Sequence, residues 1–141
     1  MSKRVIGPLQ FEKDFPVGQE LSKTRREIVK EIRDERQNNG IQYHVSRIKN
    51  NGGNLVIRFK GEKIHHLFGL SSKGEKGWLP TKYTLIMCIP EDVNLYEEIE
   101  KGRQQLERWF GEDYKTSVLL PVIYTPGDPN ILVVLLCKRN K

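Results

Sequence analysis

The sequence has few of the residues that characterise secreted scaffolds and membrane-spanning proteins. It contains two cysteines among 141 residues, Cys88 and Cys137, and each lies inside an apolar run. We expect both to be buried, reduced thiols, because so few cysteines form neither a disulfide framework nor a metal-binding pattern. No apolar run is long enough to cross a bilayer, and the N-terminal residues do not resemble a secretory signal. We therefore expect a soluble, cytoplasmic protein without a membrane partner.

Sequence fingerprints of catalysis are also missing. There is no Gly-Lys-Ser phosphate loop and no Gly-x-Ser-x-Gly elbow. The adjacent pair His65-His66 would point to opposite faces of a strand, so it does not form a two-histidine metal site. The carboxylates that could hold a metal fall on predicted loops or turns without convergence: Glu62, Glu75, Asp113 and Asp128. We predict no metal and no cofactor, and the sequence leaves open whether the protein is an enzyme.

Basic residues are present in excess. Lysine and arginine number 24 against 18 acidic residues, which gives a formal net charge of +6. A balance of this sign favours polyanionic partners, and nucleic acid is the first of these. The charge alone does not separate RNA from DNA.

The hydrophobic pattern predicts an α+β fold. We expect two helices and a mainly antiparallel sheet of about six strands, in the order α-β-β-β-β-α-β-β. Residues 1–19 contain scattered prolines and glycines and predict an irregular N-terminal arm, which Phe11 and Phe15 would anchor to the core or to a partner. Residues 20–141 are expected to form a single domain without an internal repeat.

Both predicted helices carry signals at their ends. The first is expected over residues 25–38, with Thr24 and Glu27 as a capping box and Gly40 after its last turn. The second is expected between Asn94, which pairs with Glu97 at its start, and Gly111 at its end. Gly102 lies on the apolar stripe of the second helix and predicts a close approach to a strand.

Three alternating segments, residues 42–48, 54–60 and 63–68, predict a meander. We interpret Gly61-Glu62 as a two-residue hairpin turn, which would place Arg58 opposite His65. One face would then be an apolar floor under the second helix, composed of Leu55, Ile57, Phe59, Ile64 and Phe68. The simplest pairing of the first segment sets Val45 opposite Ile57 and places His44 beside Arg58.

The opposite face of this meander and the loop after it gather basic side chains. We predict that they contact phosphates, and that Trp78 or Tyr83 could stack a base. The predicted nucleic-acid-binding residues are Arg58, Lys60, Lys63, His65, Lys73, Lys76, Trp78 and Lys82. An ordinary solvated sheet face would also carry such lysines and arginines.

The two C-terminal strands, residues 116–124 and 131–138, are almost continuously apolar. Such runs indicate strands that are covered on both faces, and one amphipathic helix cannot cover both. The first helix, the N-terminal arm or a second subunit must supply the other cover. From this we predict a homodimer.

Two other functions stay open at this stage. The protein could be an interaction or accessory module with an acidic protein partner. It could also be a metal-independent ribonuclease in which His44 and His65 exchange protons with RNA while Arg58 or Lys60 stabilises the charged intermediate.

Overall fold

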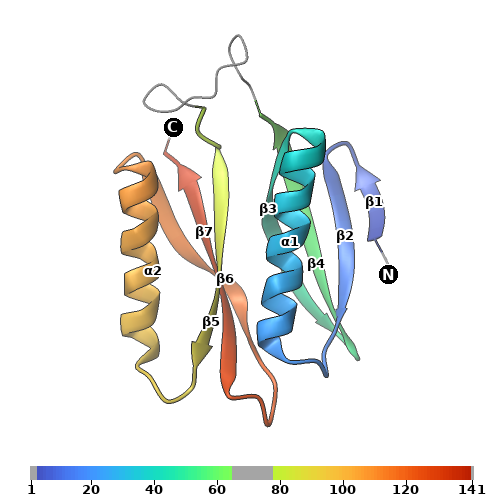
Figure 1. The fold of residues 1–141 in the computed structure, drawn as a ribbon, viewed down its shortest axis with the longest axis vertical. Coiled ribbons are helices and arrows are strands. Elements are labelled where there is room, and N and C mark those ends of the chain that lie inside the picture. The colour runs from blue at the N-terminus through green and yellow to red at the C-terminus, as the bar shows by residue number, and fades with distance from the viewer. Residues whose placement is uncertain (1–2, 65–77, 141) are drawn as a thin grey trace.

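The computed structural model of the chain describes residues 3–64 and 78–140 (Figure 1). It confirms the α+β class, and the described residues form two helices and seven strands in two antiparallel sheets. In chain order the elements are β1 (Lys3–Gly7), β2 (Gln10–Pro16), α1 (Leu21–Asn39), β3 (Ile41–Asn51), β4 (Asn54–Lys63), β5 (Lys82–Pro90), α2 (Leu95–Phe110), β6 (Tyr114–Tyr124) and β7 (Asn130–Arg139). Neither helix in the described part of the chain has the length and apolar character needed to cross a membrane.

The two halves of the chain repeat one topology that the sequence does not reveal. The first sheet has the strand order β1-β2-β4-β3 and the second has the order β5-β7-β6. Strand β2, helix α1 and strands β3 and β4 therefore correspond to β5, α2, β6 and β7, because in each half the last strand lies between the other two. Strand β1 adds a fourth strand to the first sheet, on the outer edge of β2.

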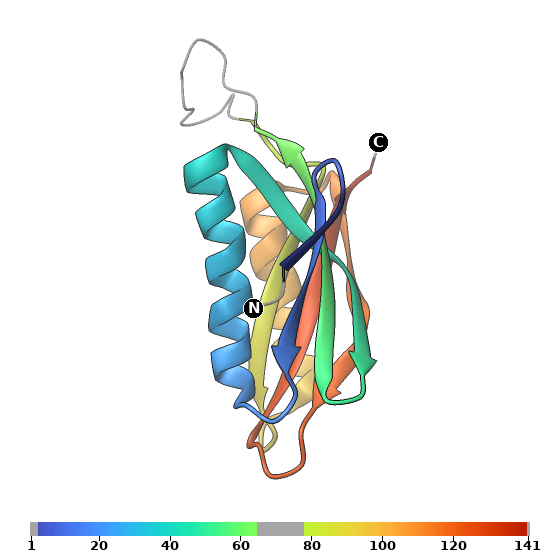
Figure 2. The ribbon, with the colours of Figure 1, turned by 90° about the vertical axis from the view of Figure 1, so that its right-hand side faces the viewer.

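Alternating residues of β7 belong to two different cores. Leu132 and Val134 pack with helix α1 and the first sheet, whereas Val133 and Leu135 pack with helix α2. Figure 1 shows the two helices on either side of β5 and β7, and Figure 2 shows α1 beside the strands of the first sheet. Strand β7 is thus covered on both faces from within one chain, whereas Leu120 and Tyr124 of β6 are exposed. The apolar run of β7 does not require a second subunit, and the homodimer stays a prediction.

The N-terminal residues differ from the expected irregular arm. They form β1 and β2, and β2 pairs with β4 along its full length, from Gln10 opposite Lys60 to Pro16 opposite Asn54. Phe11 and Phe15 are buried, and the ring of Phe11 stacks on that of Phe59 with centroids 4.6 Å apart. Anchoring to the core is therefore confirmed. Pro16 is accommodated because it is the last residue of its strand.

The first helix starts earlier than predicted and without the capping box. Its N-cap is Glu20, while Thr24 lies inside the helix and is buried. A distant residue supplies the missing cap: the carboxylate of Asp128, from the turn between β6 and β7, accepts the Leu21 N–H at 2.8 Å. The predicted end is confirmed, because Gly40 adopts the left-handed conformation with φ of 66°.

The predicted hairpin at Gly61-Glu62 is wrong, since β4 runs through both residues to Lys63. Glycine is needed at position 61 for packing, because a Cβ there would lie 2.6 Å from Ile41 Cγ2 and 2.8 Å from the ring of Tyr43. The register to β3 also differs. Val45 lies opposite Phe59, and an irregularity follows Val45, so that His44 lies opposite Lys60 rather than beside Arg58.

The two faces predicted for β4 are confirmed over residues 55–60. They are not confirmed beyond Gly61, because Lys63 lies on the face of Phe59, and Ile64, which was predicted for the apolar floor, is half-buried after the strand ends. Leu55, Ile57 and Phe59 are buried, whereas Lys60 is exposed and Arg58 is half-buried. Their cover is α1 and the second sheet, not the second helix as predicted. Phe68 lies outside the described residues.

The second helix follows its sequence signals. Asn94 Oδ1 accepts the Glu97 N–H at 3.1 Å, and Gly111 ends the helix. Gly102 is buried, and a Cβ on it would lie 2.8 Å from Met87 Sδ of β5 and 3.0 Å from Leu135 Cδ1 of β7. The predicted close approach of this glycine to a strand is confirmed. Both cysteines are free thiols, with Cys137 buried and Cys88 half-buried.

Candidate functional site

Arg58, the centre of the predicted basic face, has its charge neutralised by a neighbour. Its Nε and Nη2 donate to Glu12 Oε2 at 3.0 and 2.8 Å. The pKa of the Glu12 carboxyl lies below its ordinary value. The hydrogen bond from Arg58 is the main cause, burial acts in the opposite direction, and Arg4 lowers the pKa further. Arg58 therefore mainly links β4 to the neighbouring strand β2 through this ion pair. The hollow beside it, about 140 Å³ in volume, also contains Arg47 and Lys49.

The other predicted residues are distributed over several places. Lys63 is exposed at the end of β4, and by strand alternation it lies on the face of Phe59 rather than that of Lys60. Trp78 is half-buried ahead of β5, and Lys82 is the first residue of β5. His65, Lys73 and Lys76 lie outside the described residues. Of the predicted set, Lys60 and Lys82 both lie close enough to His44 for their charges to lower its pKa.

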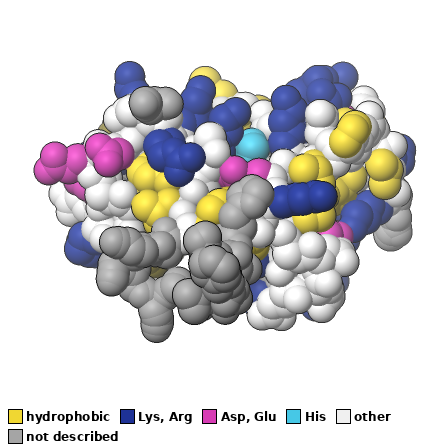
Figure 3. Space-filling view, turned by 90° about the horizontal axis from the view of Figure 1, so that it is seen from above, with side chains coloured by type: hydrophobic (Ala, Val, Ile, Leu, Met, Phe, Trp, Pro, Cys, Tyr) yellow, Lys and Arg dark blue, Asp and Glu magenta, His cyan; other side chains and the backbone are white. Residues whose placement is uncertain are grey.

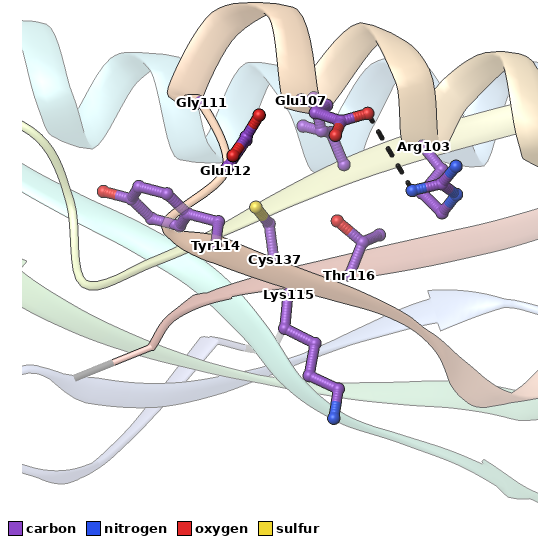
Figure 4. Close-up of a pocket in the computed structure, with 9 residues that line it drawn as sticks. Arg103, Glu107, Gly111, Glu112, Tyr114, Lys115, Thr116 and Cys137 are labelled. Carbon is purple, nitrogen blue, oxygen red and sulfur yellow. Dashed lines mark ion pairs between the residues drawn. The ribbon is translucent and has the colours of Figure 1, made fainter.

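Lysines line up across one end of the second sheet. Lys82 of β5 lies opposite Lys138 of β7, and Lys138 lies opposite Lys115 of β6. By strand alternation, Lys82 and Lys138 share the face of Ile86 and Leu132, which is turned away from α2. Figure 4 shows the Lys115 side chain pointing away from the pocket beneath α2, and therefore toward the same face. With Lys60, these residues make up the lysine cluster: Lys60, Lys82, Lys115 and Lys138.

The lysine cluster differs from Arg58 and from the basic residues of β1 and β2 in its lack of acidic partners. Lys3, Arg4, Lys13 and Arg58 each form ion pairs with carboxylates. Within residues 3–64 and 78–140, no carboxylate lies within ion-pair distance of any lysine in the cluster. Like charges directly opposite each other on neighbouring strands are destabilising. An anionic ligand would remove this repulsion.

His44 is buried near the lysine cluster, and burial is the main influence on its pKa. Its side chain is 7% exposed. Burial, followed by the charge of Lys82 and then that of Lys60, lowers the His44 pKa to about 4, with Glu62 acting in the opposite direction. His44 is therefore neutral near pH 7. Figure 3 shows lysine and arginine side chains gathered on both sides of a histidine, with acidic side chains close to it.

Two predicted roles find little geometric support. The Tyr83 ring packs against Phe110, with centroids 5.0 Å apart, and against Trp109, so it faces α2 rather than the lysine cluster. Arg58, which was expected to stabilise a charged intermediate beside His44, binds Glu12 instead.

The pocket in Figure 4, about 220 Å³, contains the buried Cys137 thiol, whose pKa is raised by burial.

Sequence reasoning missed Lys115 and Lys138. Pairing the two predicted C-terminal strands as a hairpin would have brought their far ends together and placed Lys115 beside Lys138. No local pattern in the sequence predicts that Lys138 lies opposite Lys82, because a helix and a strand separate β5 from β7 along the chain.

Replacing the central lysine of the row should stabilise the free protein. In Lys138→Gln we expect the free energy of unfolding to rise by about 0.5 kcal/mol, because Lys138 lies between two like charges. Urea denaturation at low and high salt measures this change, and the gain should shrink as salt screens the repulsion. The matched control is Lys101→Gln, which removes a helical lysine paired with Glu98. A loss of stability in Lys138→Gln at low salt would contradict the repulsive arrangement.

Comparisons of the chain with models of protein families, with curated protein sequences and with solved structures found no match.

Proposed function

We propose that this protein binds nucleic acid, as RNA or single-stranded DNA, through the phosphate contacts of the lysine cluster. The observation that supports this function best is the row Lys82, Lys138 and Lys115, whose like charges lie side by side without carboxylate partners among the described residues. Folding gains nothing from such a row, whereas a polyanion would bind it with release of counterions. Neighbouring strands are roughly 4.8 Å apart, so the row spans roughly 10 Å, which suits successive phosphates of one strand.

The proposal moves the interface from the predicted meander face to the end of the molecule where the two sheets meet. Lys60 and Lys82 are retained from the predicted set. Lysine is a suitable residue for this role, because its flexible stem carries a compact charge that contacts phosphates without selecting bases. We therefore expect binding with weak sequence preference and a strong dependence on salt.

Two competing functions make different predictions for the same experiment. An acidic protein partner would be attracted by the same charges, but a flexible polyanion such as polyglutamate would then compete as well as an oligonucleotide. Metal-independent RNA cleavage would require a second proton-transfer group beside His44. His44 itself is buried and neutral.

The test is a titration of the protein into labelled oligouridine and labelled oligothymidine, followed by fluorescence anisotropy at about 50 and 200 mM salt. We expect both oligonucleotides to bind, and both to bind less tightly at the higher salt concentration. Intact RNA after incubation without added metal is expected. Absence of binding at the lower salt would refute the proposal, and equal competition by polyglutamate would favour the acidic protein partner.

A further inference from the structure

Helices α1 and α2 stand on either side of β5 (Figure 1). A groove between the two helices has β5 as its floor. It consists of two adjoining hollows of about 330 and 610 Å³, which share Arg25, Leu85 and Ile86. Among the described residues, no lysine of the lysine cluster lines either hollow. The groove is therefore a feature separate from the proposed nucleic-acid interface.

The floor of the groove is the open edge of a sheet. Strand β5 pairs with β7 on one side, and no described strand pairs with its other side. On that open side the Ile86 carbonyl accepts the Arg25 Nε–H at 2.8 Å. Because backbone groups alternate in direction along an edge strand, Thr84 and Cys88 also turn their backbone N–H and C=O groups away from β7.

The first half of the chain shows how such an edge is completed. Strand β2, which corresponds to β5, carries β1 as an antiparallel neighbour on its outer edge. In the part of the chain that the structure describes, β5 has no counterpart of β1. No described strand occupies this position in the second half; α1 and β3 lie near β5 there, and the hollows lie between them and β5.

Thr84 supplies a second, independent indication of a missing partner. This residue lines the groove and is 7% exposed. Its Oγ1 is buried and has no hydrogen-bond partner among the described residues. A buried polar atom without a partner carries a desolvation cost. A peptide backbone laid along this edge would bring amide groups next to it.

The two walls of the groove differ in chemistry. On the α2 side, β5 presents Leu85 and Met87, and the half-exposed ring of Trp109 lies over the same end as Tyr83. At the other end α2 contributes the polar side chains Glu98, Lys101 and Gln105. On the α1 side the wall is basic and is formed by Arg25, Arg26, Arg33 and Arg36. Arg25, Arg26 and Arg36 have no carboxylate within ion-pair distance among the described residues. Successive side chains of a strand added to β5 would face these two walls alternately.

We infer that this groove binds an extended acidic segment of a partner protein, which adds as a strand to the open edge of β5. Its apolar side chains face Leu85, Met87 and Trp109, and its acidic side chains alternate with them and face the arginines of α1. Backbone hydrogen bonds provide much of the affinity, and the alternation provides the specificity. Arg25 leaves the Ile86 carbonyl, which then accepts a peptide N–H, and its guanidinium pairs with an acidic side chain.

A single-stranded nucleic acid fits the groove less well. It could use the arginines and Trp109, but it would leave the backbone edge of β5 unpaired. It would also place phosphates and sugars against the apolar wall. The observations therefore favour a peptide strand.

The test uses a labelled synthetic peptide in which valine and glutamate alternate, titrated with the full chain and followed by anisotropy. We expect saturable binding, and we expect slower hydrogen exchange at the backbone amides of Thr84 and Cys88 on addition of peptide. A peptide with the same side chains and N-methylated backbone amides should bind at least about tenfold more weakly, because it cannot pair with an edge.

Variants locate the site. Arg33→Glu combined with Arg36→Glu should abolish binding, and Trp109→Ala should weaken it. The matched controls are Arg108→Glu and Tyr96→Ala, which change exposed α2 residues that do not line the groove. Lys138→Gln should bind the peptide normally, which separates this inference from the proposed nucleic-acid function. Absence of peptide binding, equal binding of the N-methylated peptide, or loss of oligonucleotide binding in the arginine variant would each overturn the inference.

Discussion

Replacing Phe59 with alanine is expected to lower the free energy of unfolding by about 3 to 5 kcal/mol, the range found when a buried aromatic ring is truncated. Phe59 is fully buried, stacks on Phe11 at a centroid distance of 4.6 Å and lies opposite Val45 on the neighbouring strand. The ring connects β4 to β2, and thus ties the N-terminal strands to the rest of the first sheet. Urea denaturation followed by circular dichroism measures the change.

The matched control for this prediction is Val56→Ala on the opposite face of the same strand. Val56 is half-buried beside Arg58 and Lys49. Its truncation should cost less than about 1 kcal/mol, since fewer contacts are lost. If the two variants lost similar amounts of stability, the assignment of the two faces of β4 would be wrong.

Acidification should produce the second large effect, through His44. The folded protein keeps this imidazole neutral down to about pH 4, mainly because it is buried, whereas the unfolded chain takes up the proton near pH 6.5. The unfolded state therefore binds more protons between these two values. The contribution of neutral His44 is fully present above pH 6.5 and decreases as the pH falls, by about 3 kcal/mol at pH 4.

A comparison of wild type with His44→Gln isolates this contribution from that of the carboxylates. Urea denaturation of both proteins between pH 6.5 and pH 4 should show a steeper loss for the wild type. The groups with lowered pKa values, Glu12, Glu31, Asp34 and Glu100, are common to both proteins and cancel in the difference. Parallel pH profiles would show that His44 is not held neutral by its surroundings.

Local patterns in the sequence were sufficient for several features of the fold. The alternation of Leu55, Ile57 and Phe59 with Val56, Arg58 and Lys60, of which the last two are charged, predicted the buried face of β4, because period-two patterning depends on neighbours along one strand. Gly40 and Asn94 marked helix ends for the same reason, since their conformations and hydrogen bonds involve the adjoining helix turn.

The failures involve residues whose role depends on distant parts of the chain. Gly61 resembled a turn residue, but the side chains of Ile41 and Tyr43 leave no room for a Cβ there. Thr24 resembled a helix cap, but the carboxylate of Asp128 caps the helix from the other half of the molecule. Such contacts cannot be inferred from spacing along the sequence.

In the candidate site, too, some residues were predicted from local patterns and others depend on distant parts of the chain. Lys60 was predicted from the polar face of the meander and Lys82 from the loop that follows it, whereas Lys138 joins them only through the pairing of β5 with β7. The charge of Arg58 was misjudged because its partner, Glu12, belongs to a segment that was expected to be irregular. Knowing which lysines lack acidic partners requires the whole fold.

The salt dependence of nucleic-acid binding tests the central proposal most directly. The variant to measure carries Lys82→Gln, Lys115→Gln and Lys138→Gln, and its control carries Lys23→Gln, Lys30→Gln and Lys101→Gln on the helices. For oligouridine we expect the slope of log affinity against log salt to become shallower by about 2 in the first variant, from about 0.7 for each lost phosphate contact, and to stay unchanged in the control. Equal slopes in wild type and the first variant, with the fold preserved, would contradict an interface at the lysine cluster.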